Sequence, residues 1–322
     1  MKEKIVKIVD VCREFHQPSN LPVIFAVICT AGLATSYLLS AFLQHDVSPI
    51  FPRISHTGNF PPASMVFTFT LGMAAIFLIL ISHAVSRAMK AYIDNVYQKK
   101  MLSLPRNDSL DVSAIMKSEL QLCKQNHSFN RLCSFCGFLT GVGILGVGAF
   151  QTANSKLLHN ISLVVMVCGG YSFAILHSLN SRALLKSLMP LSQITHLFKL
   201  RVAVIIVGTV CIIGMFIFSV IGHIKREPSD NCTVEANDFG HAFQNCSNHS
   251  DYTTRGDRGF TYLATANAGQ WMWVISFFVF VITIRYELGH QIPSANEREQ
   301  RTELQGGDFQ LGVTNLSHVQ KV

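Results

Sequence analysis

The sequence predicts an all-α, polytopic membrane protein, a six-transmembrane-helix bundle with both termini in the cytosol. Of its 322 residues, 49% are hydrophobic and only 14% are charged, whereas about a quarter of the residues in soluble domains carry a charge. Six apolar segments each approach the roughly 20 residues that a helix needs to cross the hydrocarbon core of a bilayer. Lysine and arginine gather in alternate connections between these segments, a pattern that orients helices in a membrane.

The first 21 residues are predicted to form a cytosolic, amphipathic amino-terminal tail. Apolar residues recur there at helical spacing against basic ones. The tail is either a short helix on the membrane surface or a solvated segment, and both interpretations stay open. The first apolar segment carries no small-residue cleavage signature, so it is expected to remain in the membrane as a signal anchor.

The membrane domain is predicted to cover residues 22–287, followed by a polar, disordered, cytosolic tail at 288–322. Because the bilayer core offers no partners to backbone polar groups, its apolar segments are expected to be helices. The predicted spans are Pro22–Leu43, Ser64–Ser86, Cys133–Gln151, Asn160–Asn180, Leu200–His223 and Gln270–Arg285.

Basic residues set the expected orientation of these spans. Twenty of the 26 lysines and arginines lie in the two tails and in the connections after the second and fourth spans. Loops rich in lysine and arginine stay on the cytosolic side of the membrane. The connections after the first, third and fifth spans are therefore expected to face the lumen or the exterior, and the Arg87–Arg131 connection the cytosol.

The long connection before the sixth span has the features of a lumenal loop. It contains three N-glycosylation acceptor sequences, which begin at Asn231, Asn245 and Asn248. It also holds Cys232 and Cys246, and a cysteine pair in an oxidising compartment predicts one disulfide. The other seven cysteines lie in cytosolic or intramembrane segments and are expected to be free.

The connection between the first two spans has an unusual composition. Prolines stand at both ends of Phe51–Pro62 and fix φ there without an amide donor, and Gly58 can adopt a positive φ. The stretch is predicted to be a rigid, non-helical lumenal loop that presents Ile54 and the hydroxyls of Ser55 and Thr57 to lipid headgroups or a lumenal partner. A plain connecting hairpin is the alternative.

Candidates for catalytic or metal chemistry are few. The sequence has no Gly-x-Ser-x-Gly elbow and no histidine pair four residues apart, so neither an enzyme nor a cofactor or metal site is expected. The spans as drawn contain no Asp or Glu, which argues against an ion-coupled carrier. The net charge of +7 is spread over the loops, so nucleic acid is not an expected partner.

Two histidines and two short motifs lie in or beside the spans. His83 and His177 are the most deeply placed ionisable residues; each is either a functional group or a neutral histidine hydrogen-bonded between helices, and we favour the second interpretation. Cys133 and Cys136 have metal-ligand spacing but no further ligands. The glycines at 141–146 have the spacing of a dinucleotide-binding fingerprint, but no strand precedes them, so the motif is not expected to bind a dinucleotide. Gly137 and Gly141 are four residues apart and indicate close packing against a neighbouring helix instead.

Two further motifs lie on the expected lumenal side. The first consists of Pro52, Ile54, Ser55, Thr57, Gly58 and Pro62, and the second of Asp257, Gly259, Phe260 and Trp271. With the order of the spans and the loop sizes between Pro22 and Glu287, these motifs resemble those of the six-span family that includes the damage-regulated autophagy modulators (DRAM) and their plasma-membrane relatives. The chain is identified as a divergent member.

The chain departs from the family pattern at four positions. Arg53 stands where an aromatic residue is usual, His56 where Asp is usual, and Ala63 and Gln270 where Glu is usual. Three acidic positions are thereby lost from the lumenal face. A role of those carboxylates in binding a cation, a lipid amine or a partner would not carry over to this chain.

The resemblance implies a non-enzymatic, multi-pass protein of lysosomal or related endomembranes that promotes autophagy and, in some members, is linked to apoptosis. Membrane lipids and a cytosolic or lumenal protein are the implied partners. Two alternatives stay open: a plasma-membrane regulator of phosphatidylinositol 4-kinase complexes and lipid organisation, and a lipid carrier or scramblase.

Overall fold

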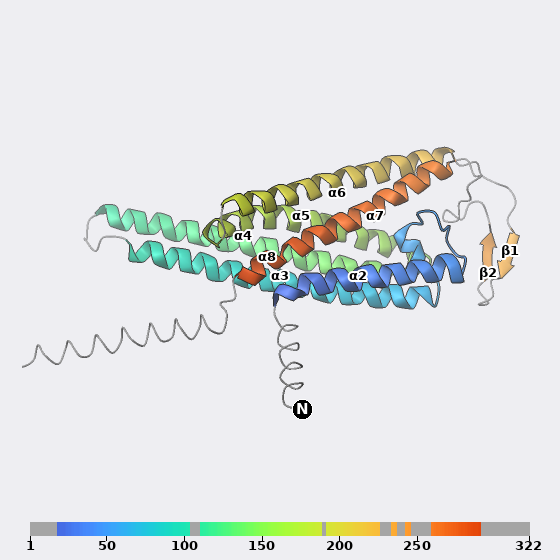
Figure 1. Ribbon diagram of the computed structural model, residues 1–322, viewed down its shortest axis with the longest axis horizontal. Helices are drawn as coiled ribbons and strands as arrows, with labels where there is room; N and C mark the ends of the chain where they lie inside the picture. The colour runs from blue at the N-terminus through green and yellow to red at the C-terminus, as the bar shows by residue number, and fades with distance from the viewer. Residues whose placement is uncertain are drawn as a thin grey trace, which may run out of the picture.

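The computed structural model describes residues 18–103, 110–188, 191–225, 233–236, 242–245 and 259–290. Within these residues, six helices are long and apolar enough to cross a membrane, and they form an elongated bundle (Figure 1). The long helices are α2 (Leu21–Leu38), α3 (Ala63–Leu102), α4 (Leu110–Ala149), α5 (Lys156–Leu188), α6 (Leu191–Lys225) and α7 (Phe260–Thr283). The predicted fold class is confirmed.

Short elements extend or connect these helices. They are the 3-10 turns Pro18–Asn20 and Ile54–Gly58, the π-helical turn Leu39–Leu43, the strands β1 (Thr233–Ala236) and β2 (Ala242–Asn245), and the helix α8 (Arg285–His290). The two strands form an antiparallel hairpin in which Thr233 lies opposite Asn245. The sequence did not suggest this hairpin, because polar residues and glycosylation sequons dominate the connection that contains it.

The two ends of the bundle differ. The connection from α2 to α3 and the β hairpin lie at one end, which we call the loop end (Figure 1). Helix α2 begins and α8 lies at the opposite end, which we call the basic end, because the connections predicted to be rich in Lys and Arg lie there.

Helices α3 and α4 are much longer than the apolar segments that predicted them. Each has 40 residues, or about 60 Å at 1.5 Å per residue, against the roughly 30 Å of a bilayer core. Beyond the basic end they continue side by side (Figure 1), and we call residues 87–131 the extension. Met89 and Ile93 are buried there between the two helices. This contact keeps the chain helical where hydropathy no longer marks a span.

Small residues let α4 approach α3 closely. A Cβ added at Gly137 would lie 2.3 Å from the Ser82 hydroxyl oxygen, and one added at Gly141 would lie 2.5 Å from Ile79 Cγ1. Both distances are too short for a side chain, so only glycine fits at either position. The predicted role of these glycines in helix packing is confirmed.

The outer surface of the bundle is apolar, most clearly on α6. Large hydrophobic side chains of this helix point outward and are more than half exposed, namely Ile206, Val210, Ile213, Phe216, Ile217 and Val220. Because a soluble protein rarely leaves so large an apolar surface uncovered, lipid is the environment that this surface fits. The protein is an integral membrane protein in contact with lipids.

Candidate functional site: a plugged cavity and a buried ion network

The loop between α2 and α3 folds into the bundle instead of lying on its surface. Ile54–Gly58 forms a 3-10 turn in which every residue is buried, and Thr57 is 0% exposed. The expectation of a non-helical loop that presents the Ser55 and Thr57 hydroxyls to headgroups is therefore wrong. The prolines shape only the flanks of the loop, while its centre finds polar partners inside the bundle. We call residues 52–62 the plug.

Helix α2 and the turn that follows it hold one side of the plug. The Ser36 hydroxyl donates a hydrogen bond to the Thr57 carbonyl oxygen at 2.8 Å, and the Thr57 hydroxyl donates to the Ile54 carbonyl oxygen, also at 2.8 Å. Gln44 Nε2 donates to the Pro61 carbonyl oxygen at 2.6 Å. These bonds satisfy backbone groups that would otherwise be costly to bury.

Helix α7 holds the other side of the plug. Trp271 Nε1 donates a hydrogen bond to the Pro52 carbonyl oxygen at 2.9 Å, across 219 positions of sequence. The Ile54 amide donates to Gln270 Oε1 at 3.0 Å. The two sequence motifs on which the family resemblance rests therefore contact each other directly. Gln270, which replaces the usual Glu, still supplies an acceptor oxygen here.

The start of α7 depends on a glycine. Gly259 precedes Phe260, the first residue of the helix, and has a φ of 91°. L side chains rarely adopt this left-handed conformation, so glycine is required at this position. Asp257, the other predicted residue of this motif segment, lies outside the described residues.

Gly58 is needed for space and not for backbone freedom. Its φ is not positive, unlike that of Gly259, so the expected reason for glycine here is wrong. A Cβ at Gly58 would lie 2.3 Å from Cγ of Phe67, an aromatic side chain of α3 that is 1% exposed. Any larger residue must push the plug away from α3.

Trp271→Phe is expected to destabilise the protein by about 1–3 kcal/mol, because it removes one hydrogen bond donor and leaves the buried Pro52 carbonyl group without its partner. The free energy of unfolding in mild detergent, measured by titration with a denaturing detergent, tests this expectation. Met272→Leu, at the exposed neighbouring position, is the control and should have no effect. Equal stability of the two variants would contradict the role of Trp271 in holding the plug.

An apolar cavity of about 110 Å³ lies among the helices. Ile54 and Ser55 of the plug line it together with Phe67, and Phe280 of α7 lines it too. Residues of all six long helices contribute, and most of them are hydrophobic. A space of this kind fits an apolar group such as part of a lipid tail.

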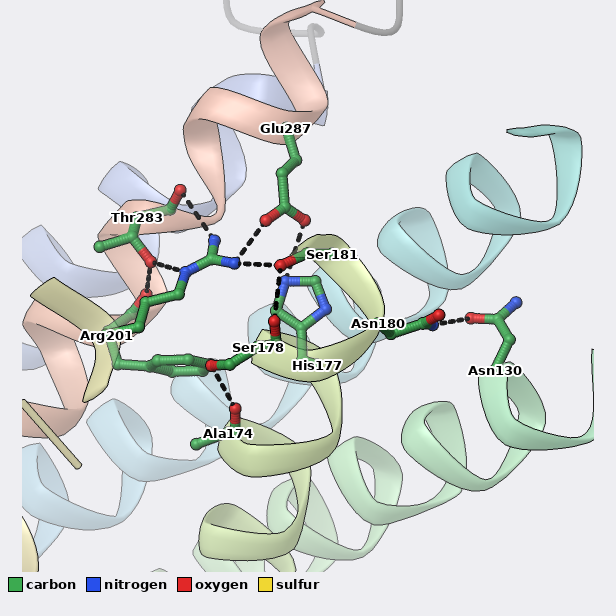
Figure 2. A network of polar contacts seen from close by, with 10 residues as sticks. Asn130, Ala174, His177, Ser178, Asn180, Ser181, Arg201, Thr283 and Glu287 are labelled. Atoms are coloured by element: carbon green, nitrogen blue, oxygen red, sulfur yellow. Dashed lines mark hydrogen bonds and ion pairs between the residues drawn. The ribbon is translucent and has the colours of Figure 1, made fainter. Parts of the chain in front are cut away.

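A network of charged and polar side chains is buried near the basic end (Figure 2). Arg201 of α6 lies 2.6 Å from Glu287 of α8, and His177 Nε2 of α5 lies 3.0 Å from the other oxygen of the same carboxylate. Arg201 also donates to the hydroxyls of Thr283 and Ser181, at 2.8 Å and 2.6 Å. None of these five residues is more than 3% exposed. The network therefore joins α5, α6 and the α7–α8 segment at the basic end of the bundle.

The contacts of the network differ in their geometry. The two contacts to Glu287 have ion-pair distances, although neither has the angles of a hydrogen bond. The contacts of Arg201 to Thr283 and Ser181 meet the hydrogen-bond criteria. The Arg201 guanidinium balances the charge of the Glu287 carboxylate, and a buried charge requires such compensation.

Sequence reasoning found only part of this network. His177 was a candidate, and it is buried 3.0 Å from Glu287. Arg201 was counted as an orienting charge although it lies inside the predicted fifth span, and Glu287 lies just past the predicted end of the sixth. The spans as drawn contained no Asp or Glu, so they did not reveal that the Glu287 carboxylate is buried. His83 faces outward from α3 and is exposed, so its predicted deep placement is wrong.

Several predicted residues lie outside the described residues. They are Asn231, Cys232, Cys246 and Asn248, whereas Asn245 is the last residue of β2. Six of the seven cysteines expected to be free lie among the described residues, and none of the six forms a disulfide there. They are Cys29, Cys123, Cys133, Cys136, Cys168 and Cys211.

The fold and the site define an integral membrane protein, a six-helix bundle closed at one end by its own first loop. The chain belongs to the Frag1/DRAM/Sfk1 family, since the family model described as Frag1/DRAM/Sfk1/Cwh43P N-terminal domain matches residues 18–291. A similar protein is DNA damage-regulated autophagy modulator protein 1 of Xenopus laevis. It is 26% identical over 213 residues, which cover 65% of this chain and 76% of that protein. No solved structure matches the chain.

Proposed function

We propose that this protein promotes autophagy as a non-enzymatic component of lysosomal or related endomembranes. Family membership and the name of the Xenopus relative, an autophagy modulator, support the proposal. The observation that carries it furthest is the contact between the two motifs, in which Trp271 and Gln270 hold the plug over the cavity. Pro52 and Trp271, one from each family motif, thus act together, and they act on the shape of the bundle.

This geometry changes the mechanism that the sequence suggested. The plug is a buried closure, so recognition of a partner is assigned to other parts of the chain. We place it on the extension, which projects from the basic end (Figure 1), and on the tail that follows α8. An adaptor or modulator working in this way requires a correctly packed bundle and an intact extension.

Restoration of autophagic flux in cells that lack the protein tests the proposal. The wild-type chain should restore lysosome-dependent turnover of autophagosomes, and Gly58→Val should not, because its side chain collides with Phe67. Gly72→Val is the matched control, since a Cβ there meets no atom within 4 Å. Full restoration by Gly58→Val at normal abundance would show that the closed plug is not needed for activity.

The cavity favours a second candidate function, binding and transport of lipid. Its apolar lining suits an acyl chain better than a headgroup. Purified protein in liposomes should then bind a photoreactive fatty-acyl probe, and a carrier or scramblase should also move labelled lipid between leaflets. Probe binding without lipid movement would leave the modulator role as the better account. Imaging of a tagged chain against lysosomal and surface markers separates an endomembrane protein from a plasma-membrane regulator.

The proposed orientation places the loop end in the lumen, so sugar is expected on Asn231, Asn245 or Asn248. Glycosidase treatment should increase the mobility of the protein on a gel, and replacement of all three residues by Gln should abolish this shift. The sequon at Asn126 lies in the extension and serves as the internal control, because Asn126→Gln should change nothing. Sugar on Asn126 would instead indicate the inverted orientation.

We also propose the disulfide between Cys232 and Cys246. The hairpin register pairs Thr233 with Asn245, and the two cysteines are the next residues outward in the sequence from this pair. Peptide mapping without reductant should recover the two cysteines in one linked species. Recovery of both as free thiols from protein kept under oxidising conditions would contradict the pairing.

A further inference from the structure

The extension brings three potential metal ligands together. Asp94 lies on α3, and Cys123 and His127 lie on α4; their ligand atoms all fall within 4.8 Å of one another. His127 Nε2 lies 3.0 Å from Asp94 Oδ1. In the part of the chain that the structure describes, no other group of three such side chains is gathered in this way.

We propose that Asp94, Cys123 and His127 bind a Zn²⁺ ion. A thiolate, an imidazole and a carboxylate are the donors that zinc accepts, whereas Mg²⁺ and Ca²⁺ prefer oxygen alone. Zinc bonds of about 2.0–2.3 Å place tetrahedral ligand atoms roughly 3.3–3.8 Å apart. Small side-chain rotations would bring the observed group to that size, since His127 Nε2 and Asp94 Oδ1 lie 3.0 Å apart and all the ligand atoms lie within 4.8 Å of one another.

The local structure supports such a site. Cys123 and His127 are four residues apart on α4, so they lie on one face of the helix, and Asp94 faces them from α3. Buried Met89 and Ile93 form an apolar base on which Cys123 packs. The carboxylate of Asp94 is 47% exposed and the imidazole of His127 is 22% exposed, which leaves the outer side open to a water molecule as the fourth ligand.

Zinc at this site would connect α3 to α4 within the extension. Three protein ligands and one water form a more accessible site than the four protein ligands of most structural zinc sites, so the ion would exchange with its surroundings. The rigidity of the extension would then depend on zinc availability. The thiol must lose its proton to bind the metal, so binding should weaken as the pH falls.

An ordinary surface ion pair between Asp94 and His127 is the competing explanation, and Cys123 separates the two. Cys123→Ser leaves the ion pair intact but removes the thiolate. The probe is Co²⁺, whose near-ultraviolet charge-transfer band reports a bond to sulfur, followed by Zn²⁺ to displace it. The experiment uses the full-length protein in detergent, stripped of metal and kept reduced.

One Co²⁺ per chain is expected, with the thiolate band lost on addition of Zn²⁺. Cys123→Ser should abolish the band, and Asp94→Asn and His127→Gln should each weaken metal binding at least about tenfold, the smallest effect seen even for outer-shell partners. The controls Cys168→Ser, Cys136→Ser and His83→Gln should bind as the wild type does. Retention of the band in Cys123→Ser, or no band in the wild type, would overturn the proposal.

Hydrogen exchange gives a second readout that does not need a coloured metal. Zn²⁺ should slow amide exchange in the parts of α3 and α4 around Asp94 and His127 and leave the exchange rates in α6 unchanged. Asp94→Asn, which preserves the shape of the side chain, should remove this protection in a protein that still elutes as a folded monodisperse species. Protection that persists in Asp94→Asn would contradict the site.

Discussion

Glu287→Leu is expected to destabilise the protein by about 3–5 kcal/mol, because it leaves the Arg201 guanidinium buried without its counter-charge. Both side chains are essentially inaccessible, at 1–2% exposure. The remaining hydrogen-bond acceptors of Arg201, the hydroxyl and carbonyl oxygens of Thr283 and the hydroxyl of Ser181, are neutral and cannot balance its charge. The free energy of unfolding in mild detergent is the quantity to measure, by denaturing-detergent titration.

Two further variants separate the charge effect from simple loss of a side chain. Arg201→Met combined with Glu287→Leu should recover most of the loss, because removal of both charges removes the burial penalty with them. Glu119→Leu makes the same replacement in the partly exposed pair with Lys100, where the cost should not exceed about 1 kcal/mol. If Glu287→Leu and Glu119→Leu proved equally mild, the network would not be holding the helices together.

Gly58→Ala is expected to destabilise the protein by about 1–3 kcal/mol or more, because one extra carbon overfills a packed site. The new Cβ would lie 2.3–2.8 Å from three atoms of Phe67, including its Cβ. Phe67 packs in a cluster with Leu33 and Ile54, so its displacement would disturb the packing of both. Thermal unfolding of the purified variant, followed by size-exclusion chromatography, measures the effect.

Gly72→Ala provides a control of opposite sign on α3. A Cβ at Gly72 meets no atom within 4 Å, and alanine favours a helix interior over glycine by up to about 1 kcal/mol. Gly72→Ala should therefore be neutral or stabilising. Phe67→Leu combined with Gly58→Ala should recover part of the loss by making space. A loss of stability in Gly72→Ala as large as that in Gly58→Ala would show that the plug is not the sensitive element.

The sequence predicted the bundle well because hydropathy reports directly on contact with lipid. Each of the six apolar segments overlaps one long helix. Hydropathy did not predict how far α3 and α4 continue, because there the two helices are stabilised by packing against each other at Met89 and Ile93 and not by contact with lipid. Hydropathy carries no information about such pairing.

The site was harder to predict because its contacts join distant parts of the chain. Pro52 and Trp271 were each singled out, but nothing in their spacing indicated that they bond to each other. The polar residues of the plug suggested exposure, yet Ser36 and Gln44 supply partners that allow burial. Arg201 shows the same difficulty in another form: a basic residue at the end of a span orients helices in most proteins, and only its carboxylate partner distinguishes it.

The accessibility of Thr57 tests the inward plug most directly. In a chain whose native cysteines are replaced, Thr57→Cys should not react with a membrane-impermeant maleimide that reaches the loop end, because Thr57 is 0% exposed. Ile50→Cys, at a position 39% exposed just before the plug, should react readily under the same conditions, and both should react after denaturation. Equal labelling of the two cysteines in the folded protein would mean that the plug lies on the surface, and the account of the closed bundle would be wrong.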